Sequence, residues 1–482
     1  MVRLALILRP RLVMRLSARS SLIFIAGLGA GLGLGLGFAK WRDVQEAKRT
    51  VTTAQVFENV MSAIRTTFVD SLTEEELYVK AAKGVVSTLG DPYSAFLGPA
   101  EFRSYRNLLR GRGETIGLTL EAGLTGLRVA TVVPKTAADR AGLKPGDFVD
   151  EVGGQPSERW LASRAMAALE RDSVAVRIQS LADSVPFEVR LVHEAAQIPA
   201  VGSVVRLSDT VGYFALRSVS ANSSAEVRDA LKALRAWELK GLVLDLRGNR
   251  GGPIDEALRI ADLFLAPGKK IASIAKRKIR WGYNAAGPEA YPDLKLSLLV
   301  DRRTASSAEI IAAALRDNER ALLVGERTFG KGLIQTTVQL GDSIAVRLTT
   351  GRWQGPGGRL ISGGIQPDVD VRPTEWEVSL RRSLGPRTGV VRTVLTGLAK
   401  AERAAGRSAD SVVLDAAKRE VIRTELRRSG LALSRRSLAV HTGLFEPELR
   451  RLVAAADSPV AAVRFGLLAD PVVAAGVLAL KP

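Results

Sequence analysis

The sequence predicts an α/β core with an open mixed sheet and helices. Strand patterns at residues 211–216, 241–246 and 296–300 alternate with helical patterns at residues 223–237 and 254–263, an order typical of α/β folds. The run at 241–246 is almost wholly apolar, which is typical of a strand buried on both faces of a parallel sheet. At 482 residues the chain is long enough for about three domains, so we expect further domains around this core.

The first part of the chain joins basic residues to an uncharged apolar stretch. Five arginines and no acid precede residues 20–39, which contain no charged side chain. About 20 apolar residues in a helix span a bilayer, and the positive flank stays cytoplasmic. We therefore expect residues 1–43 to be a cytoplasmic basic tail and transmembrane anchor in the cell inner membrane, with the rest on the periplasmic or extracytoplasmic side. A signal peptide cut after Ala39 is the alternative.

Residues 44–100 are predicted to be helical. Helical patterns cover residues 51–68 and 74–89, and acids occupy the first turn of the second helix, where they complement the helix dipole. Gly90-Asp91-Pro92 then forms a helix stop.

Residues 101–196 are predicted to form a small, strand-rich domain. Strand patterns at 127–133 and 148–152 flank a Pro-Gly turn, and a helical pattern covers 160–169. Before them, residues 115–118 read Thr-Ile-Gly-Leu. A glycine in a strand often marks a bulge, so this run alone is a weak signal of function.

Residues 197–375 are predicted to form the core, and two of its motifs suggest catalysis. Ser306 and Ser307 precede an apolar helical pattern, where a serine lies near unpaired N–H groups that stabilise an oxyanion. Lys331 stands between two glycines among apolar and small residues, and such a lysine can lose its proton near neutral pH and act as a general base. Each motif also has a plain structural explanation, a helix cap for the serines and a turn for the lysine.

Elimination favours a serine activated by a lysine. The chain has no cysteine, and its two histidines, His193 and His441, lie far from the hydroxyl-rich turn. A Ser-His-Asp triad and a histidine-based zinc site therefore lack their parts. Residues 325–331 spell G-x-x-x-x-G-K, but Gly332 stands where a P-loop needs Ser or Thr and a strand pattern follows. We reject nucleotide binding and expect no metal or other cofactor.

Taken together, the motifs resemble those of the carboxyl-terminal processing proteases, which are Ser-Lys endopeptidases with a PDZ domain. Residues 304–309 read Thr-Ala-Ser-Ser-Ala-Glu, residues 328–332 read Thr-Phe-Gly-Lys-Gly, and Gln335 follows. The resemblance covers about residues 75–370. Ala308 departs from the family, which usually has another serine there.

The resemblance implies a role for each core residue. Ser306 would be the nucleophile, Lys331, 25 residues later, the general base, and Gln335 the residue that orients the lysine. Residues 245–252 read Asp-Leu-Arg-Gly-Asn-Arg-Gly-Gly, and the family's oxyanion hole carries over to Gly251 and Gly252, together with the N–H of Ser307. Asp245 and Arg247 would pair for structural reasons.

The resemblance also implies that residues 101–196 are the PDZ domain. Its carboxylate-binding loop would consist of Ile116, Gly117 and Leu118, and residues 141–147, Ala-Gly-Leu-Lys-Pro-Gly-Asp, strengthen the match. Such a groove binds a protein C-terminus by strand addition, with a pocket for an apolar last side chain.

Residues 376–482 lie beyond the resemblance and are predicted to be a helical extension. Helical patterns cover 390–405, 410–428 and 446–456, with arginine-rich faces that we expect to be solvated. The net charge of +19 is compatible with nucleic acid or anionic lipid. We expect no nucleic-acid partner, because aromatic residues are not interleaved with the basic ones and no known module is recognisable.

The sequence thus predicts a membrane-associated serine endopeptidase that recognises apolar protein C-termini through its PDZ domain. An adaptor protein and a homo-oligomer are compatible further partners. The alternative is a catalytically silent, membrane-tethered PDZ scaffold that binds peptides without cleaving them.

Overall fold

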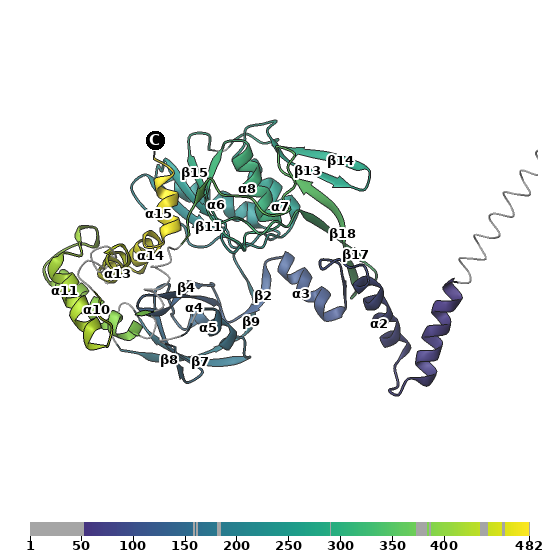
Figure 1. Cartoon of the computed structure of the whole chain (residues 1–482), viewed down its shortest axis with the longest axis horizontal. Coiled ribbons are helices and arrows are strands. Elements are labelled where there is room, and N and C mark those ends of the chain that lie inside the picture. Colours follow the sequence, from purple (N-terminus) through teal and green to yellow (C-terminus); the bar gives the residue numbers. More distant parts are fainter. Residues whose placement is uncertain are drawn as a thin grey trace, which may run out of the picture. The chain divides into compact units, whose positions relative to one another are not determined.

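The structure is a computed structural model (Figure 1), which describes residues 53–157, 160, 162–180, 185–289, 291–372, 383–384, 387–433, 442–455 and 458–481. The chain divides into two units, one ending at Gly90 and one beginning at Asp91. The predicted membrane anchor, residues 20–39, and its alternative cleavage site lie outside the described residues. Within the described ranges no single helix is long and apolar enough to cross a membrane, although residues 461–468 and 471–478, bent by 86°, meet that criterion as a pair.

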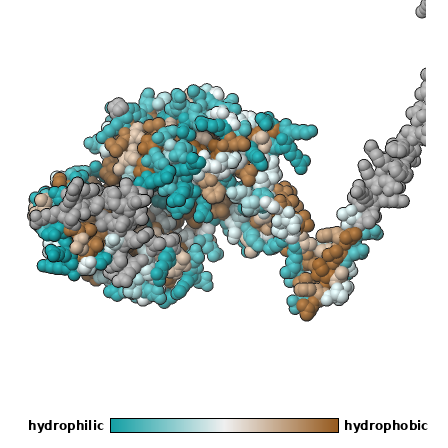
Figure 2. Space-filling model, in the orientation of Figure 1, coloured by the Kyte–Doolittle hydropathy of each residue, from teal (hydrophilic) through white to brown (hydrophobic). Residues whose placement is uncertain are grey.

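The first unit contains the two predicted helices. One covers residues 53–67, and the other is α2 (Glu74–Ser87). The Thr73 side chain accepts the N–H of Glu76 at 3.2 Å, and the Glu76 carboxylate accepts the N–H of Thr73 at 2.9 Å, so α2 begins with a capping box. Exposed apolar side chains give these helices the brown surface of Figure 2; they include Val56, Phe57, Val60, Phe68, Val85 and Leu89.

The second unit is built on a mixed sheet of six strands. In spatial order its strands are β10 (Val205–Arg206), β11 (Val211–Ala215), β12 (Gly241–Asp245), β15 (Lys295–Val300), β16 (Ala321–Gly325) and β19 (Val369–Asp370). All neighbours are parallel except β10 and β11. The predicted open mixed α/β sheet is confirmed.

Helices cover both faces of this sheet, which explains the apolar run of β12. On one face α6 (Ser223–Arg235), α7 (Ile254–Asp262) and α8 (Ser307–Asp317) share a core with Leu242 and Leu244. Val243 points to the other face and belongs to a separate cluster with residues of the C-terminal helices. Successive side chains of a strand point to opposite faces, so every position of β12 is buried.

A second sheet lies beside the core. It consists of β1 (Ala95–Leu97), β13 (Lys270–Lys276), β14 (Ile279–Asn284), β17 (Leu333–Gln339) and β18 (Ala345–Gln354). Lys331 lies in the loop between β16, a strand of the first sheet, and β17, a strand of the second sheet. No helix follows Lys331, as the rejection of a P-loop requires.

The strand-rich domain forms its own sheet with two short helices. These elements are β3 (Leu118–Gly123), β4 (Gly126–Val132), β5 (Phe148–Val152), β6 (Gln155–Pro156), β7 (Ser173–Gln179), β8 (Phe187–Val192), α4 (Ala137–Arg140) and α5 (Ala162–Ala168). A separate ribbon of β2 (Arg112–Thr115) and β9 (Glu194–Gln197) lies at the two ends of this segment. α3 (Pro99–Leu109) precedes the domain.

The C-terminal extension is helical, as predicted, but it is not an independent appendage. Its helices are α10 (Thr388–Ala404), α11 (Ala416–Arg428), α13 (Thr442–Ala454), α14 (Pro459–Leu468) and α15 (Pro471–Leu478), with a 3₁₀ turn at Ala409–Ser411. The sequence patterns did not predict α14 and α15. Both contribute to the cluster on the sheet face that contains Val243, so the extension completes the core.

The expectation that the arginines of this extension are solvated is wrong for Arg451. Its side chain is 3% exposed and pairs with the buried Glu448 at 2.9 Å. Glu448 also accepts from Arg128 of β4 at 2.7 Å and from the Thr125 hydroxyl at 2.7 Å. Arg451 is buried because it pairs with Glu448, three residues earlier, and because the strand-rich domain packs against this pair through Arg128.

Candidate active site

Ser306 occupies a strained turn between β15 and α8. Its φ is 59° and its ψ is −125°, a conformation that costs free energy for a residue with a Cβ atom. The Ser306 N–H donates to Glu309 Oε2 at 2.8 Å, and its carbonyl accepts the N–H of Glu309 at 2.8 Å. The partly buried serine thus lies at the carboxyl edge of the parallel sheet and at the start of a helix, where open α/β folds place their sites.

Glu309 is a candidate site residue to which the sequence analysis gave no role. Its carboxylate is fully buried. Besides the N–H of Ser306, it accepts the Thr328 hydroxyl at 2.5 Å and the N–H groups of Gly330 and Lys331 at 2.7 and 2.9 Å. Burial raises the pKa of Glu309 above its ordinary value, although these hydrogen bonds oppose that shift. An acid three residues after a serine at a helix start was the available signal, because this is the spacing of a capping box.

The Lys331 ammonium lies over an aromatic ring. Its Nζ is 4.6 Å from the centroid of the Tyr93 ring. Burial lowers the pKa of Lys331, and nearby Arg347 lowers it further, whereas Asp91 opposes the shift. In the described part of the chain no hydrogen bond joins Lys331 to Ser306. The backbones of the two predicted catalytic residues are brought together, but the lysine side chain rests on Tyr93.

Gln335 lies on β17, where the pairing with β18 shifts register between Ile334 and Gln335. Its side-chain amide donates to the Thr349 hydroxyl at 3.5 Å. Among the described residues no hydrogen bond links Gln335 to Lys331. Its orienting role stays a prediction that would require the lysine to turn away from Tyr93.

The three predicted oxyanion residues lie together. The Gly252 N–H donates to the Ser307 hydroxyl at 2.7 Å, and the Gly251 N–H donates to Asn249 Oδ1 at 2.8 Å. A Cβ atom at Gly251 would lie 2.7 Å from the Ser307 nitrogen, and one at Gly252 would lie 1.8 Å from the Val219 carbonyl oxygen. Only glycine permits this approach of the two loops. In this conformation the Gly252 N–H is occupied, so an oxyanion there would have to replace the Ser307 hydroxyl.

Asn249 is a second residue without a role in the sequence analysis. Its side chain is fully buried, and its amide donates to the Leu216 carbonyl at 2.8 Å. Its own carbonyl accepts the N–H of Ala305 at 2.9 Å. The Thr304 hydroxyl also donates to the Leu246 carbonyl at 2.9 Å. These contacts fix the glycine loop against the turn that carries Ser306.

The predicted carboxylate-binding loop joins β2 to β3. Ile116 and Leu118 are each 2% exposed and belong to the core of this domain. Gly117 has a φ of 89°, and a Cβ atom there would lie 1.8 Å from the Thr136 hydroxyl oxygen. The glycine is therefore needed for the approach of Thr136, irrespective of a ligand. α5 contacts β3, so the loop leads into the strand that packs against this helix.

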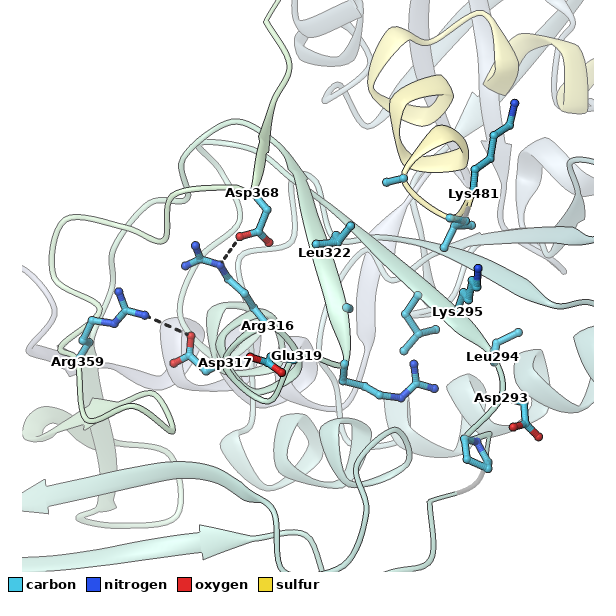
Figure 3. A pocket seen from close by; sticks show the side chains of 16 residues that line it. Asp293, Leu294, Lys295, Arg316, Asp317, Glu319, Leu322, Arg359, Asp368 and Lys481 are labelled. Carbon is cyan, nitrogen blue, oxygen red and sulfur yellow. Dashed lines mark hydrogen bonds and ion pairs between the residues drawn. The ribbon is translucent and has the colours of Figure 1, made fainter.

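A cavity of about 670 Å³ lies at the other end of α8 from Ser306. Figure 3 shows the ion pairs that line it, Arg316 with Asp368 and Arg359 with Asp317, at 2.8 and 3.8 Å. No predicted site residue lines it. Nor do the described residues contain a group of three His, Asp or Glu side chains placed to hold a metal ion.

Comparison with known proteins finds similarity to peptidases and to PDZ domains. Residues 210–371 match peptidase family S41, and residues 107–179 match the PDZ domain. The chain is 33% identical over 319 residues to "Carboxyl-terminal-processing peptidase 2, chloroplastic" of Arabidopsis thaliana, covering 61% of this chain and 60% of that protein. It is 28% identical over 325 residues to a "Probable CtpA-like serine protease" of Staphylococcus aureus, covering 66% and 65%. The chain therefore covers less than two thirds of each relative.

Among solved structures, the photosystem II D1 C-terminal processing protease is similar to this chain. The identity is 28% and the TM-score is 0.42, and the match covers 69% of this chain and 92% of that one.

Proposed function

Because this chain carries a peptidase family S41 domain and a PDZ domain, we propose that it is a serine endopeptidase that binds protein C-termini and cleaves peptide bonds by a Ser-Lys mechanism. The observation that carries the proposal is the shared carboxylate of Glu309, which holds the N–H groups of Ser306 and Lys331 at 2.8 and 2.9 Å. This contact places the backbones of the proposed nucleophile and base side by side, and holding reacting groups in a fixed geometry lowers the barrier of a reaction.

In the proposed mechanism, neutral Lys331 accepts the proton of the Ser306 hydroxyl, and Oγ attacks the peptide carbonyl carbon. The resulting oxyanion is stabilised by the N–H groups of Ser307 and Gly252. Lys331 returns the proton to the departing amine as the C–N bond breaks, which leaves an acyl ester on Ser306. Water, deprotonated by the same lysine, then hydrolyses the ester and restores the serine.

The mechanism requires the Lys331 side chain to move from Tyr93 to Ser306. Desolvation favours the neutral amine that the mechanism needs. The ring of Tyr93 has the opposite effect, because its face attracts a cation. In this proposal the conformation described above is therefore the resting state. Gln335 would orient Lys331 once the lysine side chain has turned toward Ser306.

The position of the Lys331 side chain on Tyr93, away from Ser306, also supports a second candidate function. This is a catalytically silent scaffold that binds peptides without cleaving them. The two candidates differ in one measurement. The full-length chain in detergent is incubated with an unfolded protein that has an apolar C-terminus, beside the Ser306→Ala variant. Cleavage by the wild-type chain alone supports the peptidase, whereas binding without cleavage by either protein supports the scaffold.

We extend the proposal to the membrane on the strength of residues 20–39. A retained helix there would anchor the protein in the cell inner membrane, with the peptidase on the extracytoplasmic side. The protein should then stay in membranes through a carbonate wash and need detergent for release. A mature N-terminus at Lys40 would instead show a cleaved signal peptide.

A further inference from the structure

Arg247, which directly follows β12, is held between two carboxylates from distant parts of the chain. Its Nη2 donates to Asp245 Oδ2 at 2.7 Å, and its Nε donates to both oxygens of Asp245 at 3.0 and 3.1 Å. Its Nη1 donates to Oδ2 of Asp470 at 2.7 Å. The second carboxylate comes from the C-terminal extension, 223 positions away in the sequence.

Asp245 alone cannot satisfy this guanidinium. Its carboxylate also accepts the backbone N–H of Arg247 at 2.9 Å and the hydroxyl of Tyr213 at 2.9 Å. An arginine offers five N–H donors in a fixed fork, and the Arg247 side chain is only 22% exposed. Asp470 therefore supplies the acceptor on the side of the fork that Asp245 does not reach.

Arg247 stands at the start of the loop that carries the oxyanion glycines. Its neighbour Gly248 donates its N–H to Asp301 Oδ1 at 2.9 Å. Two residues after Arg247, Asn249 accepts the N–H groups of Ala305 and Gly251. These hydrogen bonds connect the segment that begins at Arg247 to Gly251 and to the turn before Ser306.

The position of Asp470 is fixed by the helix that it caps, α15. It is the N-cap of α15, and its Oδ1 accepts the N–H groups of Val472 and Val473 at 2.8 and 3.4 Å. α15 lies against the sheet, where the Gly476 carbonyl accepts the Ser297 hydroxyl at 2.9 Å. The two oxygens of Asp470 therefore have separate partners, the helix for one and Arg247 for the other.

We propose that Asp470 is a positioning residue for peptide cleavage, which acts through Arg247 on the loop of Gly251 and Gly252. This inference rests on the proposed function. It assigns a catalytic contribution to the C-terminal extension, which lies beyond the peptidase family match ending at residue 371. Without Asp470, Arg247 keeps Asp245 but loses its second acceptor, and the oxyanion loop gains freedom that the transition state must remove.

The test is Asp470→Asn in the full-length chain. Asparagine keeps one oxygen for the helix cap, but its NH₂ group cannot accept from Arg247. We expect kcat to fall about tenfold with KM changed by less than about twofold, because the loop contacts only the oxyanion. The melting temperature should stay close to that of the wild type. Asp470→Glu, which restores a carboxylate, should recover part of kcat.

Asp410→Asn is the matched control. Asp410 lies in the same extension and pairs with Arg464 at 3.2 Å, away from Arg247. This variant should keep its kcat. An unchanged kcat in Asp470→Asn, or an equal loss in both variants, overturns the positioning role while the peptidase proposal stands. A wild-type chain that cleaves no more than Ser306→Ala overturns the proposed function, and this inference with it.

Discussion

Ser306 and Lys331 donate their backbone N–H groups to the same atom, Oε2 of Glu309, at 2.8 and 2.9 Å. The other oxygen of this carboxylate accepts from Thr328 and Gly330. One buried side chain therefore connects the start of α8 to the loop before β17. The relative position of the proposed nucleophile and base depends on four hydrogen bonds to a single carboxyl group.

Glu309→Gln should damage both activity and stability. One end of the amide is an NH₂ group, which would face backbone donors that it cannot accept from. Leaving buried donors unpaired costs about 1–3 kcal/mol each, so we expect the free energy of unfolding to fall by about 2–4 kcal/mol. Peptide cleavage should fall at least about a hundredfold. Urea unfolding and peptide cleavage measure the two effects, and normal values in both would contradict this role for Glu309.

Ser306→Gly should abolish cleavage and raise stability. The substitution removes the nucleophile, and glycine adopts the φ of 59° without the steric cost that serine bears. The gain should be about 1 kcal/mol in the free energy of unfolding. Ser306→Ala is the matched variant, because it is equally inactive but keeps the strain. A glycine variant no more stable than the alanine variant would show that the turn stores no strain.

Ser307 provides a check on the register of the nucleophile. Its hydroxyl accepts the Gly252 N–H and does not attack in our mechanism, so Ser307→Ala should be milder than Ser306→Ala in cleavage assays. The reverse order of severity would shift the nucleophile by one residue.

The rate of cleavage should rise with pH until Lys331 is neutral. The ordinary pKa of lysine is about 10.4, and burial and Arg347 lower that of Lys331, so the rise should end below the ordinary value. Tyr93→Leu removes a ring that favours the charged ammonium. Its rising limb should therefore shift to lower pH. A shift to higher pH in Tyr93→Leu would contradict the effect assigned to the ring, and a Lys331→Arg variant of normal rate would exclude the lysine as the base.

Protonation of Glu448 at acid pH should weaken the contact between the C-terminal helices and the strand-rich domain. Burial alone would raise the pKa of Glu448, but Arg128 and Arg451 hold it well below its ordinary value. A lowered carboxylate pKa gives stability that is complete above the unfolded pKa of about 4.3 and is lost as the pH falls through the folded value. Glu448→Gln should lower the free energy of unfolding at pH 7 by about 3–5 kcal/mol, since it leaves the buried Arg451 without its carboxylate partner and Arg128 with Glu121 alone. Urea unfolding at pH 7 and at pH 3 tests this, and equal stability of the two proteins at pH 7 would contradict it.

The sequence was sufficient for features that are encoded locally. β12 and α8 are apparent from apolar patterns of a few residues, and the shared motifs of Ser306 and Lys331 are evident from their spacing. Features that depend on a distant partner could not be predicted. The second acceptor of Arg247 lies 223 residues away, and Arg451 is buried because Arg128 of another domain shares its carboxylate. The pose of Lys331 on Tyr93 likewise depends on a contact that no local pattern records.

α14 and α15 were missed for a different reason. Both are apolar on nearly all sides, so no amphipathic period marks them as helices. Their apolar side chains pack against the second face of the core sheet, a contact that the local sequence does not reveal.

Recognition of a free C-terminus is the last property to test, and the structure changes which variant is informative. Any side chain at Gly117 would collide with Thr136, so a Gly117 variant would disturb the domain itself as well as a bound peptide. The substrate is therefore the better partner to alter.

A peptide with an apolar last residue and a free carboxylate should bind at least about tenfold more tightly than its C-terminal amide, because the amide removes the charge that the backbone N–H groups of residues 116–118 would bind. Replacing the last residue by aspartate should weaken binding by a similar factor, because the groove beside α5 is proposed to hold an apolar side chain. Binding is measured by fluorescence polarisation with the Ser306→Ala chain, which removes cleavage from the assay. Equal affinity for the acid and the amide would exclude carboxylate recognition, and cleavage would then have to depend on sequences inside the substrate.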